Sequence, residues 1–150
     1  MANINYDIRH GFFDLLLSSG NTAFRAAIAE TVSGTTYHKL YYVQAPQAFP
    51  DGTTLVTPPY VVFNVLPIEP DRDSATKFYS CWVQLLVSSL SATECEDIAG
   101  YITAILEDSE SRLTIGAYTV LEIRRQAQIN LGVVETVNNI AVQYSLIFEG

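Results

Sequence analysis

Charge is scarce in this sequence, and positive charge is the scarcest. Only 16% of the 150 residues are Asp, Glu, Lys or Arg, whereas about a quarter is usual in a soluble domain. The 16 acidic residues outnumber the 8 basic ones, which gives a formal net charge of -8, and only Arg124 and Arg125 are adjacent. Tight nucleic-acid binding needs clustered Lys and Arg to neutralise phosphates, so we expect none. The low charge favours a surface partly buried against other subunits, with a merely hydrophobic monomer as the alternative.

Cysteines and long apolar runs are also few. Cys81 lies in an apolar run and Cys95 in a helical pattern, which favours two buried, reduced thiols, although their spacing leaves a disulfide open. No segment reaches the roughly 18 apolar residues of a membrane span. The N-terminus lacks the basic and apolar stretches of a signal peptide. We therefore expect a protein made in the cytoplasm, without a membrane partner.

Motifs that carry catalysis or bind cofactors are missing as well. The sequence contains no G-x-S-x-G elbow and no glycine-rich phosphate loop. His10 and His38 stand alone, without the spacing of metal ligands. The acidic clusters at 69–73 and 107–110 are typical of solvated turns rather than of paired catalytic carboxylates. We predict no catalytic, metal or cofactor site, and hence a structural assembly subunit rather than an enzyme.

Apolar residues make up 49% of the chain, and their spacing predicts an α+β fold. Helices are predicted from a cap at Asn3 or Asn5 to a break at 18–21, and over 22–31 and 91–107. Strands are predicted over 37–43, 60–66, 77–87, 118–128 and 137–148. This α-α-β-β-β-α-β-β order predicts a single domain over 1–150. It would hold a mainly antiparallel sheet of about five strands with helices packed on one face.

The predicted strand 77–87 is apolar on both faces. One face carries Trp82 and Leu86, and the other carries Cys81, Val83 and Leu85. Such a strand needs cover on both sides. A helix layer could cover one side and a neighbouring subunit the other.

Two connecting segments are candidates for contacts with a partner. Segment 44–59 is proline-rich and long for a loop of a compact domain. The connector 129–136 is unusually apolar for a hairpin tip. Each could instead fold back on its own core. The candidate interface residues are Phe49, Leu55, Ile129, Leu131, Val133 and Val134.

With this layout, the chain resembles the tail-terminator, or tail-completion, proteins of long-tailed bacteriophages. The resemblance covers most of the chain. It lies in an N-terminal helical region, the segment Tyr-Tyr-Val-Gln-Ala-Pro-Gln at 41–47 and the strand Pro-Pro-Tyr-Val-Val-Phe at 58–63. A long third strand after an acidic turn, one helix and two closing strands complete it.

The resemblance implies a virion protein of the tail or neck that forms a ring, expected to be a hexamer. Such a ring ends polymerisation of the tail tube, meets the tube protein on one face and the head-tail connector or stopper on the other. DNA passes through its channel without specific binding, and the family transfers no catalytic residue. A head-tail stopper or tube subunit is the nearest alternative, and a small ligand-binding or enzymatic domain with segment 44–59 as a lid is a remote one.

Overall fold

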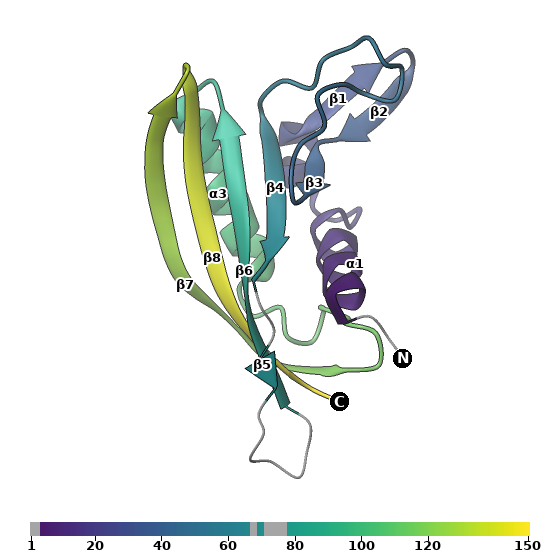
Figure 1. Cartoon of the computed structure of the whole chain (residues 1–150), viewed down its shortest axis with the longest axis vertical. Coiled ribbons are helices and arrows are strands. Elements are labelled where there is room, and N and C mark those ends of the chain that lie inside the picture. The colour runs from purple at the N-terminus through teal and green to yellow at the C-terminus, as the bar shows by residue number, and fades with distance from the viewer. Residues whose placement is uncertain (1–3, 67–68, 71–77) are drawn as a thin grey trace.

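The computed structural model describes residues 4–66, 69–70 and 78–150 as an α+β fold (Figure 1). The helices are α1 (Ile4–Leu16), α2 (Thr22–Ala27) and α3 (Ala92–Leu106). The strands are β1 (Ala29–Val32), β2 (Thr35–His38), β3 (Leu40–Tyr42), β4 (Tyr60–Val65), β5 (Glu69–Pro70), β6 (Phe78–Ser89), β7 (Thr119–Val134) and β8 (Val137–Glu149). The predicted fold class is confirmed. No helix in the described ranges is long and apolar enough to cross a membrane.

The main sheet has the order β3-β4-β6-β8-β7, and β5 pairs with β6. All its neighbours are antiparallel except β3 and β4. A parallel pair cannot be joined by a tight hairpin, and the chain accordingly travels from β3 to β4 through the long segment 43–59. The sheet is therefore mixed, although mainly antiparallel as predicted.

A separate small hairpin, β1–β2, replaces the end of the predicted second helix. The helix predicted over 22–31 stops at Ala27, and β1 begins at Ala29. The reason is the turn at Ser33 and Gly34, which have φ of 51° and 83°. Two successive positive φ values are the geometry of a hairpin turn whose twist suits antiparallel strands. The prediction that this pair ends a helix was wrong.

The prediction that residues 129–136 form a connecting loop was also wrong. β7 continues to Val134, and only Glu135 and Thr136, with φ of 49° and 69°, form the turn into β8. Three register shifts interrupt the β7–β8 ladder. At the last of these, Gly132 has a φ of +82° and its N–H donates to Asn130 Oδ1 at 2.8 Å. The bulges let the apolar segment stay in the sheet as an extension of the hairpin.

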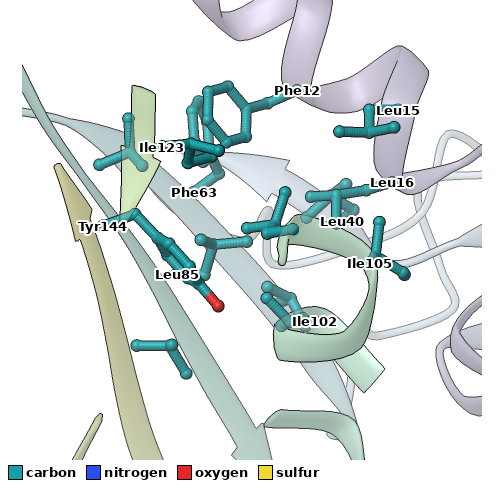
Figure 2. Packing of buried hydrophobic residues seen from close by; sticks show 14 of the residues in the cluster. Phe12, Leu15, Leu16, Leu40, Phe63, Leu85, Ile102, Ile105, Ile123 and Tyr144 are labelled. Carbon is teal, nitrogen blue, oxygen red and sulfur yellow. The ribbon is translucent and has the colours of Figure 1, made fainter. Parts of the chain in front are cut away.

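The core lies between one face of the sheet and the helices. Figure 2 shows side chains of α1, α3 and the sheet meeting there, and Phe12 stacks on Phe63 with ring centroids 5.1 Å apart. Ile102 of α3 is fully buried. Alternate residues of the sheet's central strands fill this face: Cys81, Val83, Leu85, Val87, Ile140, Val142, Tyr144, Leu146 and Phe148.

The other face of the sheet has no helix over it within the described part of the chain (Figure 1). Trp82 is 44% exposed there, and Gln143 Nε2 donates to Gln84 Oε1 at 2.9 Å. The helix layer predicted for one side of β6 is thus present. A neighbouring subunit on the other side stays a prediction.

Helix α3 begins with the predicted N-cap at Ser91, but the predicted partner of Glu94 differs. The Glu94 backbone N–H donates to Ser91 Oγ at 3.3 Å, as expected of an N-cap. The Glu94 carboxylate does not reach the Ser91 backbone directly. It accepts from Ser89 Oγ at 2.6 Å, and that hydroxyl accepts from the Ser91 N–H at 3.1 Å. The serine bridge fixes the turn between β6 and α3.

Candidate assembly surface

The β7–β8 hairpin ends in a tip of exposed apolar side chains. We define the hairpin tip as residues 129–136. Its four large apolar side chains are 42–63% exposed: Ile129, Leu131, Val133 and Val134. Together with the exposed turn they form a continuous stretch in which every residue is solvent-exposed. Contiguous exposed apolar side chains are typical of contact surfaces.

β7 is also an edge strand. It pairs with β8 on one side, and within the described residues nothing pairs with its other side. Charged side chains, which often protect an edge, occur in its first half as Glu122, Arg124 and Arg125. From Gln126 to Val134 the strand has none. The end of β7 toward the tip is therefore the less protected part of the edge.

Segment 43–59 is an ordered loop that closes on itself. The Phe49 N–H donates to the Thr54 carbonyl at 2.8 Å, and the Asp51 carboxylate accepts from the backbone N–H groups of Thr53 and Thr54 at 2.9 Å each. It also accepts from Thr54 Oγ1 at 2.6 Å. These hydrogen bonds, above all those from Thr54, hold the pKa of the exposed Asp51 carboxyl below its ordinary value. The turn is thus fixed by its own side chains.

The two candidate residues in this loop have different places. Phe49 is only 4% exposed and packs against Tyr37 with ring centroids 5.3 Å apart. Leu55 is 59% exposed. Phe49 therefore anchors the loop to its own chain, and of the two only Leu55 presents its side chain outward.

A buried lysine, which we did not predict as a site residue, ties the loop to the hairpin β1–β2. The Lys39 side chain is 2% exposed. Its Nζ donates to the Thr57 carbonyl at 2.9 Å and lies 3.4 Å from Glu30 Oε1. A buried ammonium must find such partners. The only signal in the sequence was a lone charge inside the apolar strand pattern 37–43.

Between the loop and the strands lies a hollow of about 290 Å³, which we call the loop hollow. Its walls include the side chains of Tyr37, His38, Tyr41, Pro46, Ala48 and Phe49. Burial, and then the nearby charge of Arg25, lower the pKa of His38, whereas burial, and then Glu30, raise the pKa of Tyr41. Both rings are therefore neutral at pH 7. The hollow offers mainly apolar, aromatic walls.

The remaining candidates for chemistry in the described chain are two thiols, one imidazole and any cluster of metal ligands. Cys81 and Cys95 are free and buried, as predicted, and burial raises the pKa of Cys81 to about 12 and also raises that of Cys95. Such thiols are inert because the thiolate is the reactive form. His10 Nε2 lies 3.4 Å from Asp14 Oδ2 on an exposed helix face. In the ranges that the structure describes, no cluster of three His, Cys, Asp or Glu could hold a metal ion.

Comparison with known proteins finds similarity only at the level of fold. No family model matches the chain, and no curated protein matches its sequence. A chain described as part of the virion of a native gene transfer agent particle matches with a TM-score of 0.57 and 12% identity, over 93% of this chain and 92% of that one. A second solved structure, whose name states no function, matches with a TM-score of 0.53 and 16% identity, over 98% and 96%. The whole fold, rather than a fragment, is thus shared.

Proposed function

We propose that this chain is a structural subunit of a phage-like virion, and specifically a tail terminator. In this role it forms a ring, expected to be a hexamer, at the head-proximal end of the tail tube. The observation that carries the proposal is the likeness of fold, over nearly the whole chain, to a component of a gene transfer agent virion. The resemblance of the sequence to tail terminators is the reason for proposing this particular place within the virion.

The exposed surfaces support assembly. A monomer would gain nothing from holding Val133 and Val134 at 63% exposure on an extended hairpin. Neighbouring subunits would cover the tip and the unpaired side of β7. A ring needs each subunit to present two different surfaces, because head-to-tail contacts are the ones that close into cycles of more than two subunits.

The proposed partners follow from the position in the virion. One face of the ring would meet the tail tube protein and stop its polymerisation, and the other would meet the head-tail connector or stopper. DNA would pass through the channel. The net charge of -8 suits a passage rather than a binding site, because like charge discourages adhesion of phosphates.

The mass in solution and the effect on tube growth test the proposal. Native mass spectrometry is expected to find a species of about six times 16.6 kDa, and negative-stain images are expected to show six-fold rings. Added to polymerising tube protein, the chain should bind tube ends and shorten the tubes. Incorporation along the tube would instead identify a tube subunit, and binding only to head connectors would identify a stopper. A strict monomer, both alone and with tube protein, would contradict ring formation.

A further inference from the structure

The hairpin tip and the loop hollow lie at the same end of the sheet but at its opposite edges. We propose that the hairpin tip of one subunit seats in the loop hollow of the next, so that this contact repeats head to tail around the assembly. The inference rests on the proposed ring and names the contact that would build it.

The pairing of the strands places both surfaces. β7 and β3 are the two outer strands of the main sheet. Ser88, near the end of β6, pairs with Tyr60, the first residue of β4, and with Asn139 of β8. The loop therefore enters β4 at the same end of the sheet at which the hairpin turns, as Figure 1 shows. A tip at one edge cannot reach the hollow at the other edge of the same chain, but a second copy can supply it.

The two surfaces match in polarity, and the hollow is preformed. The tip offers Leu131, Val133 and Val134, which are 54–63% exposed. The hollow offers aromatic and proline walls and about 290 Å³ of space. The Asp51 hydrogen bonds and the buried Lys39 hold its loop wall in place. A preformed apolar hollow loses little conformational entropy when it receives a side chain.

The charges next to these surfaces match as well. The turn of the tip carries the exposed carboxylate of Glu135. His38 lines the hollow, and the charge of Arg25 acts, after burial, to lower the pKa of that ring. Arg25 forms no ion pair within the described chain, and its buried Nε has no hydrogen-bond partner there. In a chain with only 8 basic residues, an unpaired guanidinium on this side favours an incoming carboxylate.

Cysteine crosslinking tests the contact directly. In Val133→Cys combined with Ala48→Cys, mild oxidation of assembled rings should give a covalent ladder that ends at the full ring. Each single variant should stay monomeric on a denaturing gel. The native thiols should not compete, because both are buried and their pKa values are raised. Leu121→Cys with Ala48→Cys is the matched control, and it should give no ladder. Leu121 is 42% exposed but lies at the other end of β7, between Val120 and Glu122, which pair with Phe148 and Ile147.

A charge exchange tests the ionic part. Glu135→Arg alone and Arg25→Glu alone should each raise the concentration at which rings form by about tenfold or more. The double variant should recover most of that loss. Thermal unfolding of each variant checks the fold. If Arg25→Glu does not fold, Arg25→Gln and Glu135→Gln are compared instead: each alone should weaken ring formation, and the double variant should weaken it little further than either single variant.

The outcomes separate the two proposals. If the unmodified chain forms rings but the Val133→Cys, Ala48→Cys variant gives no ladder, or the double exchange shows no recovery, the tip-in-hollow contact is overturned and the proposed function still stands. Absence of rings from the unmodified chain, with and without tube protein, overturns ring formation itself and the contact with it. A ladder together with the recovery establishes the contact.

Discussion

The two strands of the β7–β8 hairpin are hydrogen-bonded neighbours with opposite burial. β8 has no exposed position, and its alternate residues fill the core, whereas Ile123 is the only buried residue of β7. Both strands nevertheless carry large apolar side chains. In β8 most of these side chains point into the core, and in β7 most of them lie exposed near the hairpin tip. The difference indicates that apolar residues serve two purposes here. Those of β8 stabilise the monomer, whereas those of the hairpin tip stay exposed and would be buried by a partner in the proposed assembly.

A matched pair of leucines tests this difference most strongly. Leu146 of β8 is fully buried and Leu131 of β7 is 54% exposed. Leu146→Ala should lower the free energy of unfolding of the monomer by about 2–5 kcal/mol, because it removes buried methyl groups and leaves a cavity. Leu131→Ala should change it by less than about 0.5 kcal/mol. Urea denaturation of both variants under monomeric conditions is the measurement. Equal losses of unfolding free energy would contradict the division between core residues in β8 and exposed residues at the tip.

Lys39 should have the next largest effect, on the loop side. Lys39→Ala removes the donor to Thr57 and the partner of Glu30, and should cost about 1–3 kcal/mol of unfolding free energy because it leaves a polar group unsatisfied. Segment 43–59 should also become the first site of limited proteolysis. Lys39→Met keeps the apolar stem and serves as the control for packing. If neither variant exposes the loop to protease, Lys39 is not what holds it.

The hairpin tip should affect assembly without affecting the monomer. Val133→Asp and Val134→Asp each place a charge where a neighbour would bury the side chain. Each should weaken ring formation by about tenfold or more, equivalent to ~1.4 kcal/mol, and should change monomer stability by less than about 0.5 kcal/mol. Analytical ultracentrifugation over a concentration series measures the first effect and urea denaturation the second. Leu90→Asp, equally exposed outside the tip, is the control, and normal rings in both tip variants would exclude the tip from the interface.

Most of the fold could be predicted from the sequence because its periodicity is local. The apolar stripes of α1 and α3, and the alternation along β6 and β8, each lie within one element. The hairpin β1–β2 was not predicted, because Ser33 and Gly34 suit both a helix end and a hairpin turn. The parallel pairing of β3 and β4 depends on where a long loop returns, and no short segment encodes that.

The candidate surface was predictable in part for the same reason. The apolar residues of the tip stood out in sequence, but their place in a long strand did not, because bulges shift the alternation that marks a strand. Phe49 and Leu55 looked alike in sequence, and only the fold separates the buried anchor from the exposed side chain. The loop hollow joins residues of two strands and a loop, so it exists only once the chain has folded.

The smallest expected effect is a pH dependence confined to the loop. Hydrogen bonds from Thr54 and Thr53 hold the pKa of the folded Asp51 carboxyl below its ordinary value of 3.8. A depressed folded-state pKa contributes stability that is present above 3.8 and lost as the pH falls through the folded value. NMR titration should therefore find the Thr53 and Thr54 amide resonances moving with a midpoint below pH 3.8. Asp51→Asn should abolish that titration and leave the resonances of β8 unchanged, because the carboxyl is exposed and its hydrogen bonds stay within the loop. A midpoint at or above 3.8 would mean that the turn is not fixed by these hydrogen bonds, and the loop wall of the hollow would then be less preformed than the hairpin tip that it is proposed to receive.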